Sequence, residues 1–465
     1  MPAGGTWQSQ NKVRPGAYIN VVGVPKPLGS IGERGVVAIA MEPGWGENLI
    51  SLTVQEFLTG AGLYKIGANY TDDSDVARQL RLLFQGAARA IIRRTNKSQV
   101  KASATITSST CTATAKYAGT FGNNISLKVA LNTVGEDPDI ELVSVTVETY
   151  VNDVLKATMT SADKTAFSND WVDITASSLD SFTAGTFALT GGTNGSADDL
   201  TNIFADLEQE NWNVLAFPAT SSTDKDAAVA FVKSMRDDAG IKVQAILTEC
   251  SGTSGTDYTF TSYDPDYEGI YVCKQGYRLS DATVVSPIDE VYMIAGLVAG
   301  ATITQSLTGT VIQNAVEILN GPKTNDGIIE AINGGKLVLS KRRDGAIVIE
   351  YDVNSFTSIT AKKGKIFTKG RPMRVMDNLA NDIKALFDTT YLGKVSNNDD
   401  GRDIFKADII KYMNDLQKLE AVQNFDSETD IQVIAGDDSD AVVVNLWVQP
   451  VDSMEKLYMT VNVWG

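Results

Sequence analysis

The composition of the chain changes at about residue 99 and returns to its earlier pattern at about residue 197. Residues 101–200 hold 28 serines or threonines and a single proline, Pro138. Alternating apolar and polar runs recur there, such as 126–131 and 141–147, with turn-forming clusters between them. Short alternating strands at this spacing predict a small β-sandwich or barrel. We therefore expect residues 99–196 to be an all-β domain inserted into a chain of a different kind.

Buried strands alternate with helices on both sides of this insertion. Apolar runs at 35–40, 213–218 and 242–247 predict strands, and 222–239 predicts a helix between the last two. A strand–helix–strand order implies parallel strands in a doubly wound sheet. Apolar residues on one face also predict a helix over 75–94. We assign residues 30–98 to a small α/β domain and residues 197–355 to an α/β core domain.

The C-terminal part, residues 356–465, reads as an α+β domain. It follows a hairpin at 336–353, whose Asp344-Gly345 pair favours a tight turn. Helices are predicted at 376–387 and 402–422, and strands at 430–434 and 441–449. The expected fold class is thus a multidomain α/β and α+β chain, in which a βαβ core carries an inserted all-β domain and a C-terminal α+β domain.

Both ends of the chain carry strand-like runs without an obvious local partner. Residues 1–29 read as an extended arm, with a short strand at 16–22 and a proline-containing connector at 23–29. The last run, 457–464, is apolar on one face almost to the final residue. Such a strand must be paired, or it promotes aggregation. Adding strands head to tail onto neighbouring sheets generates open helical polymers.

Charge and residue usage exclude several classes of function. Lys plus Arg total 40 and Asp plus Glu total 57, a net charge of −17 that disfavours binding to nucleic acid or to anionic membranes. Histidine is absent, which removes triad and HExxH chemistry. The chain has no GxxxxGK[ST] phosphate loop. We predict no catalytic residues, no metal and no cofactor, and expect that the protein is not an enzyme.

Cysteine usage and the longest apolar run complete this picture. Cys111, Cys250 and Cys273 are far apart and are expected to be reduced, mostly buried thiols. The run 291–301 is too short to cross a bilayer and predicts a buried helix. The N-terminus lacks the apolar core of a secretion signal. Assembly in a reducing cytosol is consistent with these features.

Several stretches of the sequence resemble one protein family. They are the opening GGTWQSQNKVRPGAYIN, the following PKPLGSIGERGVVAIA, the stretch AGLVAGATITQSLT, the AINGG before the hairpin, and the ending PVDSMEKLYMTVNV. In these stretches, and in their order along nearly the whole chain, the sequence is similar to contractile tail sheath proteins of phages, prophages and phage-tail-like bacteriocins of Gram-positive bacteria. The insertion at 99–196 contributes least to the resemblance.

The resemblance implies a structural subunit of a helical homopolymer. Such subunits stack as hexameric rings around a tail tube, and both chain ends complete a small sheet on a neighbour's C-terminal domain. The implied N-terminal arm residues are Ala17, Tyr18, Ile19, Val21 and Val22. The implied donated C-terminal strand contains Leu457, Met459, Val461 and Val463. The receiving strands are either the 336–353 hairpin or 441–449, with candidate residues Leu337, Leu339, Ile347, Ile349, Val443 and Leu446.

The resemblance also implies a surface that faces the tube and a set of partners. The helix at 402–422 matches the family's tube-facing helix, with Lys406, Lys411 and Lys418 as candidate contacts; a solvated helix face is the alternative for these lysines. The implied partners are further copies of the chain, the tube protein, and baseplate and tail terminator proteins. The implied location is a virion tail or tail-like particle, assembled in the host bacterial cytoplasm, whose contraction drives the tube through an envelope.

Two other functions compete with this interpretation. A Thr-rich surface adhesin or an S-layer-like assembly protein fits the composition of the insertion, but it requires a secretion signal. A Rossmann-like enzyme fits the βαβ pattern, but it requires a Gly-rich loop or clustered acid–base residues. Neither requirement is met in the sequence.

Overall fold

A computed structural model describes residues 3–5, 16–18, 34–107, 111–135, 141–162, 167–254 and 257–464. The chain divides into two compact units. The larger one, here the core unit, comprises Glu33–Asp377 and Val451–Gly465. The smaller one, here the C-terminal unit, comprises Asn378–Pro450, and the N-terminal Met1–Gly32 groups with it.

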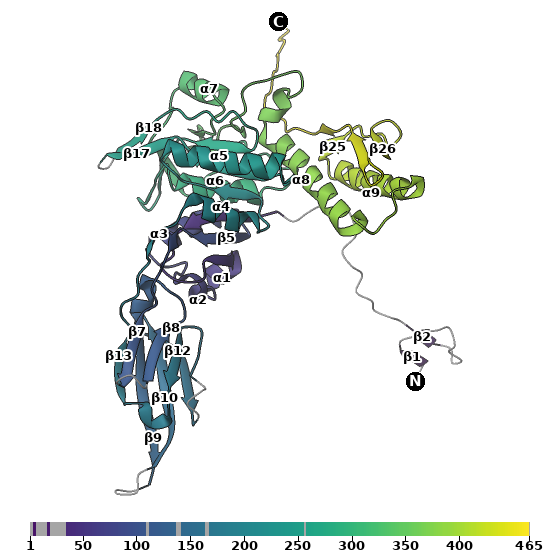
Figure 1. Ribbon diagram of the computed structural model, residues 1–465. Coiled ribbons are helices and arrows are strands. Elements are labelled where there is room, and N and C mark those ends of the chain that lie inside the picture. The colour runs from purple at the N-terminus through teal and green to yellow at the C-terminus, as the bar shows by residue number, and fades with distance from the viewer. Residues whose placement is uncertain are drawn as a thin grey trace. The chain divides into compact units, whose positions relative to one another are not determined.

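A six-stranded sheet organises the core unit (Figure 1). All neighbouring strands run parallel except the last pair, which is antiparallel. The strands, in spatial order, are β19 (Ile270–Cys273), β16 (Gln244–Thr248), β15 (Val214–Ala216), β3 (Val36–Met41), β5 (Arg89–Arg94) and β4 (Leu49–Thr53). The parallel core predicted from the βαβ pattern is therefore present.

Helices cover both faces of this sheet because its strands are apolar on both sides. Ala38 and Leu215 belong to one hydrophobic cluster, together with α4 (Leu200–Glu208) and α5 (Ser222–Asp237). Val37 and Val214 belong to the other, with α3 (Asp75–Leu83) and α6 (Glu290–Gly300). Successive strand residues point to opposite faces, so two separate cores form.

Close packing of α6 against the end of α3 explains the glycines in its apolar run. A Cβ built on Gly296 would lie 2.0 Å from the carbonyl oxygen of Leu83, and one on Gly300 would lie 2.0 Å from that of Gly86. Only glycine permits this approach of helix and backbone. The predicted buried helix at 291–301 is confirmed as α6, whose residues are nearly all buried.

Two predictions for the first part of the chain are wrong. The helix predicted over 75–94 ends at Leu83, and Arg89–Arg94 forms β5 in the middle of the sheet. Residues 30–98 are also not separate from residues 197–355, because β3 pairs with β15 and both stretches share one sheet. The insertion interrupts a single domain, and the chain closes that domain again after it.

The insertion consists of two antiparallel sheets with their own core. One sheet has the order β11 (Val154–Ser161), β10 (Glu141–Val151), β9 (Ile125–Val134) and β13 (Gly185–Ala188). The other has the order β12 (Val172–Ala176), β8 (Cys111–Ala115) and β7 (Ser103–Thr107). The short strands β6 (Asn96–Lys97) and β14 (Ser196–Ala197) pair where the insertion leaves and rejoins the core.

The remaining elements of the core unit are short. They are α1 (Val54–Thr59), α2 (Leu63–Ile66), α7 (Asn325–Asn333), β17 (Cys250–Ser254), β18 (Asp257–Phe260), β20 (Tyr277–Leu279), β21 (Val284–Val285), β22 (Ala315–Ile318), β23 (Leu339–Lys341) and β24 (Ile347–Ile349). All three cysteines are free and buried, as predicted for Cys111, Cys250 and Cys273. No helix in the described part of the chain is long and apolar enough to cross a membrane.

Between Asn378 and Pro450, the C-terminal unit contains α-helical residues of α8 (Gly370–Leu386) and α9 (Asp399–Lys418), a short π-helix at Phe387–Tyr391 and two small strand pairs. Helix α8 starts in the core unit and continues into the C-terminal unit. Strand β26 (Ile431–Ala435) pairs with β27 (Val442–Leu446), and β25 (Val422–Gln423) pairs with β28 (Gln449–Pro450). Helix α9 lies beside β26 (Figure 1).

The predicted domain boundary at 355/356 differs from the division between the compact units. The first turns of α8 stay with the core unit because buried ion pairs hold them there: Arg374 to Asp352 at 2.7 Å, and Asp377 to Arg236 at 2.8 Å. Residues 451–464 also belong to the core unit, although they follow the C-terminal unit in sequence.

At the N-terminus, β1 (Ala3–Gly5) pairs in parallel with β2 (Gly16–Tyr18). The predicted arm residues Ala17 and Tyr18 lie in β2. Ile19, Val21, Val22 and the connector at 23–29 lie outside the described residues.

Candidate functional site

The last residues of the chain, 457–464, form no helix or strand (Figure 1). Their side chains are exposed. Leu457 is 83% exposed and Trp464 is 95% exposed. Met459, Val461 and Val463, predicted to share a strand face with Leu457, are exposed as well. So much uncovered apolar surface on one segment is typical of a binding segment. In this structure the segment pairs with no strand of the described residues.

Just before this segment, the chain is held to the core unit. Glu455 forms an ion pair with Lys369, and each of the two side chains is only 6% exposed. The other carboxylate oxygen of Glu455 accepts a hydrogen bond from Ser306 Oγ at 2.7 Å. The Lys369 ammonium also lies 4.4 Å from the centre of the Tyr351 ring. We name Ser306, Tyr351, Lys369 and Glu455 the C-terminal anchor.

The surroundings of the C-terminal anchor keep both partners charged. Burial raises the pKa of Glu455, but hydrogen bonds from Lys369 and Ser306 outweigh it and bring the pKa below its ordinary value of 4.5. Burial lowers the pKa of Lys369, but its bond to Glu455 raises the pKa above 10.5 overall. Asp452, at 3.3 Å from Lys369, adds to this effect. The pair therefore stays ionised at neutral pH.

The β26–β27 hairpin offers two open sheet edges. Trp447 N donates to Asp430 O, and Gly436 N donates to Ala441 O, so the even-numbered residues of β26 bond to β27. The main-chain groups of 431, 433 and 435, and those of 442, 444 and 446, consequently point outwards. No residue in the described ranges forms a hydrogen bond with them. Both edges are free to accept another strand.

The exposed face of this hairpin carries three apolar side chains, Ile434, Val443 and Trp447, together with the polar pair Gln432 and Asn445. Ile434 and Val443 lie opposite each other in the ladder, and both are exposed. Trp447 follows on the same face and is 54% exposed. Leu446, the other candidate receiving residue in this hairpin, lies on the opposite face and is half-buried.

The 336–353 hairpin, by contrast, has no free edge. Its candidate residues Leu337, Leu339, Ile347 and Ile349 are fully buried in the core cluster. On one side, Leu337 N donates to Val272 O of β19 at 2.9 Å, and Gln275 Nε2 donates to Leu339 O at 3.1 Å. On the other side, Ile349 N donates to Thr310 O at 3.0 Å. The chain's own segments occupy the places that an added strand needs.

Helix α9 presents its lysines on two different sides. Phe405, Ile409, Tyr412 and Leu416 form its buried face, as predicted, but Leu419 lies past the helix end and is exposed. Lys411 and Lys418 are seven residues apart and lie within about 20° of each other around the helix. Lys406 is about 140° from Lys411 and is half-buried. The three lysines therefore do not form one contact stripe.

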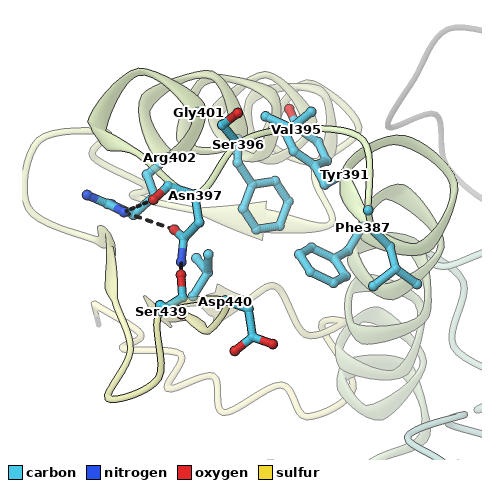
Figure 2. A pocket seen from close by; sticks show the side chains of 13 residues that line it. Phe387, Tyr391, Val395, Ser396, Asn397, Gly401, Arg402, Ser439 and Asp440 are labelled. Atoms are coloured by element: carbon cyan, nitrogen blue, oxygen red, sulfur yellow. Dashed lines mark hydrogen bonds between the residues drawn. The ribbon is translucent and has the colours of Figure 1, made fainter.

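A pocket of about 490 Å³ lies between the start of α9 and the β26–β27 turn (Figure 2). Phe387, Tyr391 and Phe405 supply its aromatic wall, and the rings of Tyr391 and Phe405 are 4.5 Å apart. On its polar side, Arg402 Nη1 donates to Asn397 Oδ1 at 2.9 Å. Asn397 Nδ2 donates in turn to Ser439 O at 3.0 Å, which holds the hairpin turn in place.

The pocket contains no paired acid and base. Burial, with a hydrogen bond to Asp408, raises the pKa of Tyr391 well above its ordinary value. Arg402 also pairs with Asp399. Across the described ranges, no three His, Cys, Asp or Glu side chains form a cluster that could hold a metal ion.

Comparison with known proteins identifies the family of this chain. Residues 194–355 match the family model of the phage tail sheath protein central domain, and residues 362–464 match the phage tail sheath C-terminal domain. The phage-like element PBSX protein XkdK of Bacillus subtilis (strain 168) is 32% identical, with 99% of each chain covered. The chain belongs to the phage tail sheath protein family.

Solved structures of tail sheath proteins share this fold. The crystal structure of the sheath tail protein from Desulfitobacterium hafniense is 32% identical, with a TM-score of 0.74, and the match covers 96% of this chain and 99% of that one. The helical sheath of the anti-feeding prophage in its contracted state is 12% identical, with a TM-score of 0.54 and coverage of 97% and 99%. At that identity the likeness concerns the fold alone.

Sequence reasoning missed the C-terminal anchor of this tail sheath protein. Ser306 lies in the stretch AGLVAGATITQSLT and Glu455 in the ending PVDSMEKLYMTVNV, and neither residue was singled out within these stretches. The two residues are 149 positions apart, and only the fold brings them together. The available signal was weak: Glu455 is one acidic residue shortly before an apolar run.

Proposed function

We propose that this protein polymerises as stacked hexameric rings around a tail tube and contracts to drive the tube through a bacterial envelope. The observation that carries the proposal is the exposed apolar segment 457–464, in a tail sheath protein whose β26–β27 hairpin has two open edges. Neither the segment nor the hairpin edges have a hydrogen-bonded strand partner within the described chain. An added strand is what an open sheet edge can bind. The contracted helical sheath with the same fold supports the contraction step.

In this scheme, the C-terminal segment of one subunit adds to the β26–β27 hairpin of a neighbour. The 336–353 hairpin is disfavoured as the receiver because its edges are occupied within its own chain. A strand beside β27 can place one face near the half-buried Leu446 and the other beside Val443 and Trp447. The N-terminal arm around Ala17 and Tyr18 is assigned to the remaining edge.

Helix α9 is the proposed tube-facing element. Lys411 and Lys418 share one exposed stripe and are the candidate contacts, whereas Lys406 lies on another side. Lys418 also pairs with Asp415 at 2.9 Å, so its charge is partly compensated. The tube protein, the baseplate and the tail terminator are the further partners. The particle is a virion tail or a tail-like particle assembled in the host cytoplasm, and the role of the subunit is structural, not catalytic.

A truncation after Lys456 tests strand donation directly, because it removes the exposed segment and keeps the C-terminal anchor. We expect the truncated subunit to stay soluble and to unfold at the wild-type temperature. It should form no tubes, since each junction loses roughly four to eight main-chain hydrogen bonds at about 1 kcal/mol each. Negative-stain microscopy of purified subunits provides the readout, with hollow striated tubes expected for the wild type.

The matched control is a chain that ends at Val463. It keeps all four residues of the apolar strand face and should still form tubes. Normal tubes from the chain that ends at Lys456 would contradict strand donation. A truncated chain that unfolds early would instead place the segment in the folding core, against its exposure.

A further inference from the structure

We propose that the C-terminal anchor is a force-bearing point: tension on the donated strand passes through Glu455 into the core unit and is not taken up by movement of residues 452–456. This inference rests on the proposed strand donation and concerns what happens to the load once the strand is bound. Glu455 is bound to the core unit, whereas Leu457 and the residues after it are exposed. The transition from bound to exposed chain therefore occurs within two residues.

The residues leading to Glu455 are also attached to the core. Lys369 contacts Asp452 at 3.3 Å, and Arg371 Nη1 donates to Ser453 Oγ at 2.9 Å. Lys456 Nζ lies 5.3 Å from the centre of the Tyr351 ring. Side chains at 452, 453, 455 and 456 are therefore all engaged, and the segment cannot lengthen without breaking these contacts.

A second set of buried contacts joins the loop that carries Ser306 to the start of helix α8. Leu307 N donates to Asp352 Oδ2 at 3.0 Å, which fastens the loop that carries Ser306. Arg374 binds the same carboxylate oxygen at 2.7 Å and donates to Gln305 O at 2.6 Å. Arg374 and Asp352 are both fully buried. Pulling on Glu455 therefore loads the loop and the start of α8 together.

Helix α8 continues this connection into the central sheet. Asp377, two turns after Lys369, receives two hydrogen bonds from the Arg236 guanidinium, at 2.8 Å and 3.0 Å. Arg236 lies on α5, which packs against β16. Each link is an ion pair or a charge-assisted hydrogen bond shielded from water, and such links are stronger than exposed ones. The load reaches the sheet without passing through a loose segment.

Releasing the anchor would add slack to the connection between subunits. Five residues, 452–456, would become free, with a reach of up to ~3.5 Å each. The strand would still reach its neighbour, but a movement of the neighbour would straighten the freed residues before it moved the core. Contraction should then be incomplete while assembly survives.

The first experiment measures the anchor in the isolated subunit, by the rate of trypsin cleavage after Lys456. The bound segment must detach before it fits a protease, so cleavage follows local opening. In K369M and E455Q we expect cleavage at least about tenfold faster than in the wild type, because each leaves a buried charge without its main partner. K369R keeps the cation and should restore slow cleavage. K384M, which removes an exposed ion pair near the end of helix α8, should cleave at the wild-type rate.

The second experiment images tail particles that carry each variant, before and after a contraction trigger. We expect K369M and E455Q to form extended sheaths of normal length that lose full contraction, while K369R and K384M contract completely. Full contraction by K369M and E455Q, or wild-type cleavage rates, would overturn the proposal. Failure of these folded variants to assemble would also overturn it, because the anchor would then act in docking. If the chain truncated after Lys456 still forms tubes, strand donation itself is wrong, and the cleavage rates still report on the anchor.

Discussion

Glu290 opens helix α6 with a fully buried carboxyl group. One of its oxygens accepts a hydrogen bond from Gln275 N at 3.0 Å, and no cation in the described ranges pairs with it. Burial raises the pKa of Glu290 to about 8, from an ordinary 4.5. The nearby Cys273 and Tyr277 also have raised pKa values, again mainly through burial. The folded protein therefore keeps Glu290 protonated at neutral pH, whereas the unfolded chain ionises it.

This difference makes stability depend on pH. Because the pKa is higher in the folded state, the contribution of Glu290 is fully present below about pH 4.5 and is lost as pH rises through about 8. E290Q keeps the shape without the ionisation. We compare the unfolding free energy of E290Q minus that of the wild type at two pH values. We predict that this difference is larger at pH 9 than at pH 5 by on the order of a few kcal/mol. Urea unfolding at both pH values measures this, and a constant difference would refute the assignment.

Arg374 and Asp352 form a buried ion pair that supports the start of α8. We predict that R374M lowers the unfolding free energy by about 3–5 kcal/mol, because it leaves the Asp352 charge buried without its partner. The exposed pair between Lys384, near the end of the same helix, and Asp388, just beyond it, is the control, and K384M should cost less than about 1 kcal/mol. Urea titration of both variants compares them. Equal losses of unfolding free energy in R374M and K384M would mean that burial does not make the loss of an ion-pair partner more costly.

At the scale of elements, the apolar pattern predicts most strands and helices of the sheet but misassigns one boundary. Ala87, Ala90 and Ile91 continue the helical spacing of α3, and the same residues suit a strand buried on both faces. Tertiary packing favours the strand. Gly86 packs so closely against α6 that a side chain at this position would clash, and α3 ends before Gly86. Such an approach between distant segments leaves no local signal in the sequence.

Trp45 ties the insertion to the core unit. Its side chain has no exposed surface and belongs to the hydrophobic cluster of the insertion, although it precedes that domain by more than fifty residues. Its ring packs against those of Tyr117, Phe121 and Trp171, and its Nε1–H donates to Tyr64 O at 2.8 Å. The insertion is thus compositionally separate but not independent of the core in packing.

We predict that replacing residues 98–195 with a short Gly/Ser linker yields aggregated protein unless Trp45 is changed as well. The deletion exposes the indole, whereas β6 and β14 already pair and need only a short connection. The deletion combined with W45S should be soluble and should still form tubes. Size-exclusion chromatography and negative-stain microscopy compare the two. A soluble deletion with native Trp45 would contradict the role of Trp45, and loss of tubes from a folded double variant would place the insertion in the lattice.

At the scale of the whole molecule, the sequence predicted the parallel core, the all-β insertion, the helices of the C-terminal unit and the sheath resemblance. It left two receiving hairpins open because both are apolar and similar in length. The structure distinguishes the two hairpins by their edges. Hydrogen bonds with β19 and Thr310 occupy the edges of the 336–353 hairpin, whereas no such bonds occupy those of β26–β27 within the described residues. The C-terminal anchor was missed for a related reason: Ser306, Lys369 and Glu455 come from three distant segments.

The central claim is that the segment 457–464 of one subunit pairs with the β26–β27 hairpin of another. Cysteine cross-linking in assembled particles tests it most directly, because opposed residues on paired strands have Cβ atoms about 4.5–5.5 Å apart. Cysteines placed singly at Leu457, Met459, Val461 and Val463 are combined with one at Val444 on β27 or at Val433 on β26. The account predicts a ladder of covalent oligomers on a non-reducing gel for at least one combination, and none with a cysteine at Thr133 in the insertion. Particles that assemble normally but give no ladder with either hairpin strand would contradict it.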